Sequence, residues 1–233
     1  MHIPDGLLAP TVWAPLAGVS AGALALSVRR ANQTLAERKI PLMGCMGAFV
    51  FAAQMINIPV YAGTSGHLVG SALLAVIFGP AVACIVMSCI LIIQALVFGD
   101  GGVTALGANI FNMAVVSPFL AYAVYRLATG LWRTRRGRWT GAFVGAWFGT
   151  VAGAAVAGVE VGLSPHLPLI PAVAFMTGYH VIIGVFEGLI TATAVVAIRG
   201  LTPASELDFV GDRGLTTAAS EATPAGAPTG GAS

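Results

Sequence analysis

The chain has 233 residues, of which 57% are hydrophobic and only 9% are charged, and its mean hydropathy is +0.89. Soluble domains are far more polar, so the composition excludes a water-soluble globular protein and indicates an all-α membrane protein. The net charge is +2 and no segment forms a basic face, which gives no support to nucleic-acid binding. The three cysteines lack a CxxC spacing and lie in apolar segments, so we interpret them as packing residues.

A helix needs about 20 apolar residues to cross a bilayer, and the sequence contains seven candidate spans. They are residues 8–28, 42–60, 66–78, 80–98, 106–127, 141–163 and 169–198. The third is short for a crossing, and Gly79-Pro80 separates it abruptly from the fourth. We keep it because seven crossings give a consistent topology, and we predict a polytopic bundle of about seven transmembrane helices.

The basic residues test that topology. Lys and Arg occur after the first span, between the fifth and sixth spans, and after the last span. With seven crossings these segments share one side, and the positive-inside rule places that side in the cytoplasm. We therefore predict an amino terminus outside and a carboxyl terminus inside. Residues 1–200 would form the transmembrane domain, and residues 201–233, rich in Thr, Ala, Pro, Gly and Ser, a disordered cytoplasmic tail.

Two spans carry a small residue at every fourth position, which lets helices approach closely in lipid. The sixth span contains Gly141, Gly145, Gly149 and Gly153, and the second contains Gly44, Ala48 and Ala52. Such a stripe is interpreted either as packing within the chain or as a face for a partner protein. The stripe of the second span is our candidate docking face.

The chain begins MHIPDGLLAP, without the Lys or Arg that normally opens a targeting segment. His2 is too large for methionine aminopeptidase, so we expect Met1 to remain and to keep a free amine. This amine, the His2 backbone nitrogen and the His2 imidazole can close adjoining chelate rings on one ion. Nitrogen-rich, square-planar coordination is typical of Ni²⁺ or Cu²⁺. Pro4-Asp5-Gly6 would turn the terminus back toward the bundle. The alternative is a frayed start with a chance histidine.

A second histidine offers the fourth donor. In the run AGTSGHLVG (residues 62–70) we expect His67 in the first turn of the third span, with Thr64 or Ser65 as the helix N-cap. The predicted topology places His67 on the same outer side as Met1. A metal site then becomes the better interpretation, although a histidine at a helix start is more often an ordinary interfacial residue.

Other polar residues inside the spans should face the interior of the bundle, because they are costly in lipid. Candidates for hydrogen bonding around the metal are Asn57, Thr64, Ser65, Gln94 and Asn109. Plain interhelical hydrogen bonding is an equal alternative for them. His180 and Glu187 lie two turns apart on one face of the last span, and suggest either a proton or cation path or a buried polar pair. Asp100, in the loop FGDGG, could close over the site.

Five motifs carry a resemblance to a known family: MHIPDG, QMINIPVYAGTSGHLVG, FGP, QALVFGDGGVTALGAN and HVIIGVFEGLITA. To about residue 200 the chain resembles the CbiM/NikM family, the substrate-binding S components of energy-coupling factor (ECF) transporters for cobalt and nickel. The resemblance implies an ion bound by the Met1 amine, the His2 amide and imidazole nitrogens, and the His67 imidazole. The motif GTSGH resembles that of the nickel branch of the family, so Ni²⁺ is favoured over Co²⁺.

The resemblance also implies partners and a location. The partners are a transmembrane T component, two cytoplasmic ATPases and, as a further candidate, a small accessory membrane subunit. The location is the inner (cell) membrane of a prokaryote. The metal ion is the cargo, and no cofactor is implied.

Two other classes of function remain open. A self-sufficient secondary metal transporter could use His180 and Glu187 for proton coupling, but the sequence has no clear inverted repeat of broken helices. An intramembrane enzyme would need an HExxH-type motif or a nucleophile with a paired base, and neither is visible. We therefore expect a transport subunit rather than an enzyme.

Overall fold

The structure is a computed structural model that describes residues 1–201 except Tyr61, so the predicted tail from residue 202 onward lies outside the described residues. The helices are α1 (Pro10–Thr34), α2 (Ile40–Gln54), α3 (Ser71–Phe78), α4 (Pro80–Ile93), α5 (Leu106–Ile110), α6 (Ser117–Leu131), α7 (Arg135–Gly162) and α8 (Leu169–Leu201). A 3-10 turn (Glu37–Lys39) precedes α2. A π-helical turn extends α4 (Gln94–Phe98), and another joins α5 to α6 (Phe111–Val116).

Five of these helical stretches are long and apolar enough to cross a membrane. They are Pro10–Thr34, Pro80–Phe98, Leu106–Leu131, Arg135–Gly162 and Leu169–Ile198. They correspond to the first, fourth, fifth, sixth and seventh predicted spans. The chain is therefore a helical bundle of the multi-pass membrane type, as its composition predicts.

The second and third predicted spans are shorter than expected. Helix α2 ends at Gln54, and the residues predicted to continue it form β1 (Asn57–Pro59), which pairs antiparallel with β2 (Ser65–His67). Helix α3 has only eight residues, about 12 Å of rise, and cannot cross a 30 Å hydrocarbon core alone. The hairpin before α3 is buried on one strand only: β2 is largely buried, whereas all three residues of β1 are exposed.

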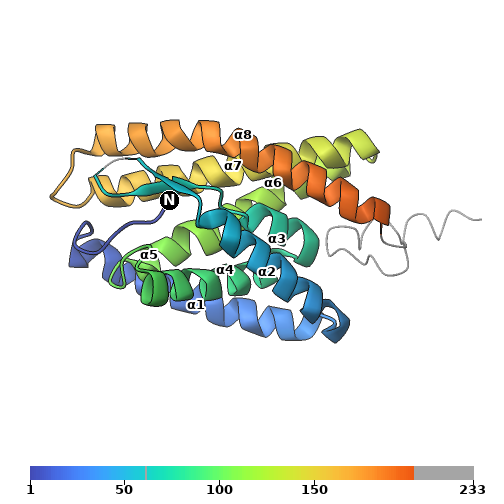
Figure 1. The fold of residues 1–233 in the computed structure, drawn as a ribbon, viewed down its shortest axis with the longest axis horizontal. Coiled ribbons are helices and arrows are strands. Elements are labelled where there is room, and N and C mark those ends of the chain that lie inside the picture. The colour runs from blue at the N-terminus through green and yellow to red at the C-terminus, as the bar shows by residue number, and fades with distance from the viewer. Residues whose placement is uncertain (61, 202–233) are drawn as a thin grey trace, which may run out of the picture.

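The helices pack around α3. Helix α7 lies along both α6 and α8, while α1 lies along α4 and α5 on the other side of the bundle (Figure 1). Helix α3 sits between these groups and contacts α4, α6, α7 and α8. Every residue of α3 is buried, which explains why its sequence is apolar on all sides.

The glycine stripe of α7 explains its close contact with α6. A Cβ atom added to Gly145 would lie 2.6 Å from the carbonyl oxygen of Ala121, and one added to Gly149 would lie 2.5 Å from that of Ser117. Only glycine permits such an approach of one helix to the backbone of another. Between the two interpretations of this stripe, the structure selects packing within the chain.

The small-residue stripe of α2 has a different environment. Its members Gly44, Ala48 and Ala52 are exposed, and a Cβ atom added to Gly44 would meet nothing within 4 Å. Within the described residues this face of α2 is therefore not used for close packing.

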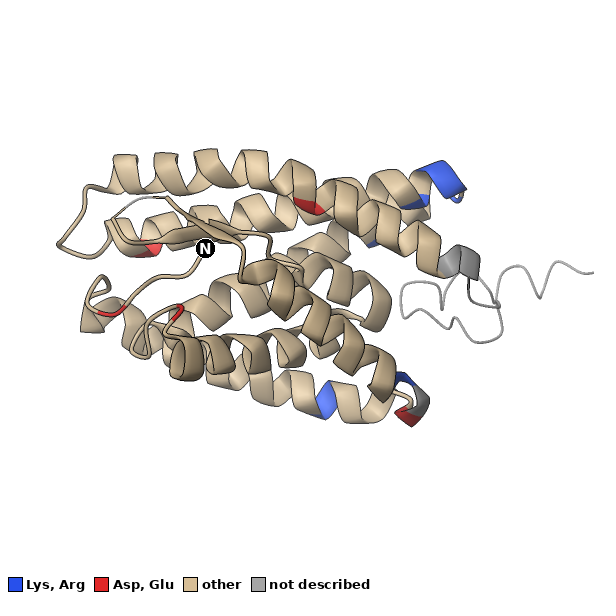
Figure 2. Cartoon of the chain, in the orientation of Figure 1, with Lys and Arg blue, Asp and Glu red and all other residues tan. Residues whose placement is uncertain are grey.

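Charge is distributed unevenly along the bundle. Figure 2 shows Lys and Arg gathered at one end, on the α1–α2 and α6–α7 connections and the turns beside them. The α4–α5 and α7–α8 connections lie at the other end. The two predicted basic segments within the described part of the chain thus share one end of the molecule.

Candidate metal centre

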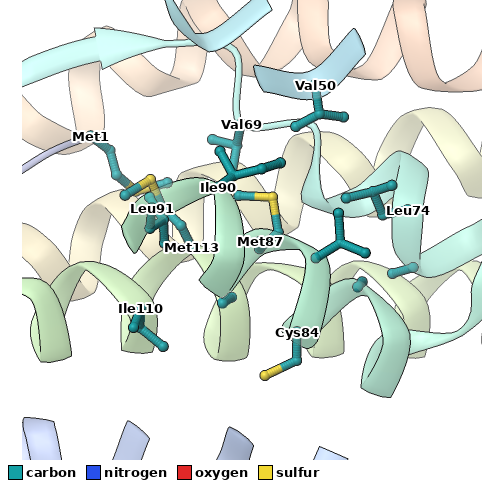
Figure 3. Close-up of a cluster of buried hydrophobic side chains, with 14 of the residues drawn as sticks. Met1, Val50, Val69, Leu74, Cys84, Met87, Ile90, Leu91, Ile110 and Met113 are labelled. Atoms are coloured by element: carbon teal, nitrogen blue, oxygen red, sulfur yellow. The ribbon is translucent and has the colours of Figure 1, made fainter. Parts of the chain in front are cut away.

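The first three residues are buried in the bundle rather than frayed. Met1 and Ile3 have no exposed surface, and Figure 3 shows the Met1 side chain entering the apolar cluster that contains Leu91 and Met113. Asn109 bonds Ile3 reciprocally: its Oδ1 accepts from Ile3 N at 2.9 Å, and its Nδ2 donates to Ile3 O at 3.1 Å. The side chain of Asn109 thereby acts as a strand partner for the terminus.

Asp5 fixes the turn that follows. Its carboxylate accepts from the backbone N–H groups of Val103 and Thr104 at 3.0 and 2.7 Å, and from the Thr104 hydroxyl at 2.5 Å. The Thr104 hydroxyl is the main reason that the pKa of Asp5 lies below its ordinary value. The loop lies directly on the terminus, because a Cβ atom added to Gly102 would lie only 2.4 Å from Asp5 N.

The β-hairpin brings His67 to His2. The backbone N–H of Ser65 donates to His2 O at 3.3 Å, and the N–H of His2 donates to Ser65 Oγ at the same distance. Two residues further along β2, the His67 ring stacks on the His2 ring with centroids 4.5 Å apart and planes inclined by 23°. Both side chains are almost fully buried.

The structure corrects the predicted local setting of His67. This residue ends β2, and α3 begins at Ser71 after Gly70, so neither Thr64 nor Ser65 is the N-cap. The helix does not extend back to His67 because Gly70 adopts a left-handed conformation with φ of +74°. The Thr64 hydroxyl instead contacts Met176 Sδ at 3.2 Å.

The His67 imidazole is prepared to act as a ligand. Its Nδ1 lies 2.8 Å from the carbonyl oxygen of Leu68, which can only accept, so Nδ1 carries the proton. The other nitrogen, Nε2, is buried and has no hydrogen-bond partner. A neutral histidine held in this way presents the unprotonated Nε2 that metals bind.

The His2 imidazole lies between two oxygens. Its Nε2 is 3.2 Å from Gln94 Oε1, and its Nδ1 is 3.1 Å from Asp100 Oδ1. Asn57 donates to the other Asp100 oxygen at 3.2 Å. The FGDGG loop is therefore closed over the site, with Asp100 against the histidine.

Burial keeps the candidate nitrogens unprotonated. Desolvation lowers the pKa of the Met1 amine well below 8.0, although the nearby Asp100 carboxylate opposes the shift. Desolvation also lowers the pKa of His67 well below 6.5, assisted by the terminal amine and His2. For His2 burial again lowers the pKa, opposed by Asp100 and Gln94. Nitrogens in this state need not release a proton to bind a cation.

Side chains alone do not supply a metal site here. Among the residues that the structure describes, no three His, Cys, Asp or Glu side chains gather closely enough to hold an ion. A site formed by His2 and His67 would therefore need nitrogens from the amino terminus, as the sequence predicts. The structure brings Met1, His2 and His67 together; their role as ligands remains a prediction.

Four of the five residues predicted to form hydrogen bonds around the metal lie at or beside His2, and one does not. Ser65 and Gln94 touch His2, Asn109 holds Ile3, and Asn57 reaches the site through Asp100. Thr64 points toward α8. Gln54 was not predicted to belong to the site, yet its side-chain oxygen accepts from Gln94 Nε2 at 3.0 Å. A glutamine inside an apolar span was the signal that could have identified it.

His180 and Glu187 do not pair with each other. The Nδ1 of His180 donates to Met176 O at 2.7 Å, and its Nε2 is buried without a partner. Glu187 accepts from the backbone N–H groups of Val69 and Gly70. Both side chains are buried, and each is held by the backbone rather than by the other.

A multi-pass helical membrane protein with nitrogen donors collected around a buried amino terminus is the class that this fold and site define. The sequence matches the family described as "Cobalt uptake substrate-specific transmembrane region" (CbiM) over residues 2–205. The chain therefore belongs to the CbiM family.

Individual relatives agree. The chain is 38% identical over 205 residues to a putative metal transport protein of Haloquadratum walsbyi, covering 87% of this chain and 92% of that one. It is 37% identical over 218 residues to the fused nickel transport protein NikMN of Rhodobacter capsulatus, covering 87% and 63%. A crystal structure of a transition metal transporter superposes with a TM-score of 0.81 at 32% identity, covering 93% of this chain and 99% of the other.

Proposed function

We propose that the protein captures one divalent transition-metal ion through four nitrogens: the Met1 amine, the His2 backbone nitrogen, the His2 imidazole and His67 Nε2. The observation that carries the proposal is His67 Nε2, a buried nitrogen without a partner, beside the His2 ring and the buried terminus. Leaving such an atom unpaired costs free energy. An ion held between the two histidines would accept the lone pair of His67 Nε2.

Nickel is the proposed substrate, with cobalt as the alternative. Four nitrogen donors, three of them from two consecutive residues, suit the tetragonal geometry that Ni²⁺ accepts readily. Binding at the His2 backbone nitrogen displaces its proton, which Ser65 Oγ now accepts at 3.3 Å. The R. capsulatus relative is named as a nickel transport protein, which agrees with this choice.

We propose further that the chain is the substrate-binding subunit of an ATP-driven ECF importer. Its sequence has no GxxxxGK[ST] motif for binding ATP, so partner ATPases would supply the energy. The partners would be two such ATPases and a transmembrane T component, with a small accessory membrane subunit as a further candidate. The exposed stripe of Gly44, Ala48 and Ala52 offers a smooth helix face for one of them.

The proposed orientation follows from charge. The positive-inside rule assigns the basic end of the bundle to the cytoplasm, in the inner membrane of a prokaryotic cell. The metal centre would then lie toward the outside, beneath the FGDGG loop, on the side where an importer must capture its substrate.

Metal analysis of the purified protein with an intact amino terminus tests the proposal. We expect one nickel ion per chain and tighter binding of nickel than of cobalt by isothermal titration calorimetry. Uptake of nickel by cells should require co-expression of the T component and ATPases. Sustained uptake with this chain alone would contradict the ATP-driven role and favour a secondary transporter.

A further inference from the structure

We infer that the side-chain amides of Gln54 and Gln94 form a hydrogen-bonded chain, the amide relay, that positions His2 for metal binding. The Val69–Gly70 peptide, held by Glu187, fixes which atom of each amide donates and which accepts. The inference rests on the proposed metal site and adds to it two positioning residues that are not ligands.

The relay begins at a peptide group that is held on both sides. Glu187 on α8 accepts from Val69 N at 2.9 Å and from Gly70 N at 2.7 Å. On the other side of the same peptide, Gln54 on α2 reaches the Val69 carbonyl oxygen at 2.5 Å. The side chain of Val50 fills the space beneath Gly70, where an added Cβ would lie 2.6 Å from it. This peptide therefore has one orientation.

That orientation decides the direction of every later hydrogen bond. A carbonyl oxygen can only accept, so the Gln54 atom facing Val69 is the amide nitrogen, and Gln54 Oε1 faces Gln94. Gln94 must then donate from Nε2 to Gln54 Oε1, which it does at 3.0 Å. The remaining oxygen, Gln94 Oε1, lies 3.2 Å from His2 Nε2. Since this oxygen also only accepts, the proton of His2 belongs on Nε2.

A proton on Nε2 leaves the other imidazole nitrogen of His2 for the metal. Nδ1 is the nitrogen that can close a chelate ring with the backbone nitrogen of the same residue. Three amide groups, namely the Val69–Gly70 peptide, Gln54 and Gln94, point head to tail with their oxygens toward His2. In a buried row such hydrogen bonds strengthen one another, and a bond to the outer nitrogen makes an imidazole a better ligand. Gln54 and Gln94 have no exposed surface.

Asp100 favours the other neutral form of His2, with the proton on Nδ1. Its Oδ1 lies 3.1 Å from His2 Nδ1 and would favour a proton on that nitrogen. A proton there blocks the position at which the ion binds. The relay therefore selects the Nε2–H form of a neutral histidine that could otherwise donate to Asp100. Loss of the relay should shift His2 toward the Nδ1–H form.

The test measures the tautomer and the metal affinity separately. ¹⁵N NMR of histidine-labelled, metal-free protein at a pH above the ordinary histidine pKa reports which His2 nitrogen carries the proton. Nickel affinity is measured on the same samples. The variants are Gln94→Met and Gln54→Met, which keep side-chain length but lose the amide. The control is Ser88→Ala, a buried change on α4 that removes hydrogen bonds to the carbonyl and thiol of Cys84 and touches no member of the relay.

We expect Nε2–H in the wild type and in Ser88→Ala, and a shift to Nδ1–H in both methionine variants. Gln94→Met should weaken nickel binding by about 10–100-fold, the usual cost of losing a group that orients a ligand. Gln54→Met should weaken nickel binding by more than about threefold, but by less than Gln94→Met does, because Gln54 acts on His2 only through Gln94. The double variant should be no worse than Gln94→Met alone, since both changes interrupt one chain.

Gln54→Glu separates the relay from general packing. A glutamic acid buried here is expected in its neutral form, whose O–H can donate to the Val69 carbonyl while its other oxygen accepts from Gln94 Nε2. Gln94 should then stay oriented and His2 should keep Nε2–H. If residue 54 only filled space, a buried carboxyl group would disturb the site more than methionine does. The relay predicts that Gln54→Glu disturbs the site less than Gln54→Met does. An unchanged tautomer in both methionine variants, or additive losses in the double variant, would overturn the inference.

Failure of the proposed metal site would look different. Adding one residue ahead of Met1 would then leave nickel affinity unchanged, while the tautomer of metal-free His2 would still respond to Gln54→Met and Gln94→Met. Failure of the relay alone would leave the tautomer unchanged in a protein whose nickel binding still depends on Met1 and His2.

Discussion

His2 and His67 stack ring on ring, with centroids 4.5 Å apart, although one belongs to the amino-terminal segment and the other to a strand before α3. The contact is set by backbone pairing, because the N–H of Ser65 donates to the His2 carbonyl at 3.3 Å. The site therefore depends on how deeply the terminus enters the bundle, and changes to the terminus are its most direct test.

One residue added ahead of Met1 should abolish high-affinity nickel binding. The addition converts the Met1 amine into an amide and moves the free amine away from the His2 chelate. It also has no room, since Met1 is completely buried. Calorimetry on the extended protein and on a protein extended after Ser233 checks this. Equal nickel affinity of the two would contradict a role for the terminal amine.

Replacing His67 by alanine should weaken nickel binding by about tenfold or more without abolishing it, because the three nitrogens of Met1 and His2 remain. His2→Ala should be more damaging, since it removes the imidazole and lets methionine aminopeptidase remove Met1. His166→Ala is a matched control, because His166 is exposed on the α7–α8 loop. The order of dissociation constants, lowest for wild type and His166→Ala and highest for His2→Ala, is the expected result.

Much of this arrangement could be predicted from the sequence, and the exceptions share a cause. Hydropathy found the five long helices, because burial in lipid demands long apolar runs. It failed at β1, where Ile56, Ile58 and Val60 continue the apolar pattern of α2. An apolar run of this kind does not tell a helix from a strand. The strand forms because this segment pairs antiparallel with β2.

Contacts that end on the backbone were the hardest to predict. The sequence places Glu187 and His180 on one face, yet the partners of Glu187 are the N–H groups of Val69 and Gly70. Every residue except proline has such a group, so no residue pattern marks the one that is used. The grouping of Met1, His2 and His67 was easier to predict, because metal chelation requires particular side chains and a free terminus; their role as ligands stays a prediction.

Acid should destabilise the metal-free protein in two steps. Burial lowers the pKa of the Met1 amine well below 8.0 and that of His67 well below 6.5, so at these two groups the folded protein holds fewer protons than the unfolded chain. Their contribution to stability is fully present above these ordinary values and falls as the pH drops below each of them. Unfolding by denaturant in detergent, between about pH 8 and pH 5, measures this. His67→Gln should reduce the slope below 6.5, and an unchanged slope would contradict the prediction.

Asp5 should hold the terminus in place for metal binding. Asp5→Ala removes three bonds to Val103 and Thr104, so we expect nickel to dissociate faster and to bind about tenfold more weakly. Thr104→Val removes only the hydroxyl bond and should have a smaller effect. In the double variant the Thr104 change should add nothing, because its partner is already absent. Additive effects in this cycle would show that the two residues act separately.

Helix α7 allows the orientation of the chain in the membrane to be tested at its two ends. Its 28 residues rise about 42 Å, more than the 30 Å of a hydrocarbon core, so Arg135 at its start and His166 beyond its end should lie on opposite sides. Cys45, Cys84 and Cys89 are first replaced by alanine, since two of them are exposed. A membrane-impermeant maleimide should then label H166C in intact cells, and R135C only after permeabilisation, if the basic end faces the cytoplasm as we propose. Labelling of R135C in intact cells would reverse the orientation and place the metal centre on the cytoplasmic side, where capture for import is impossible.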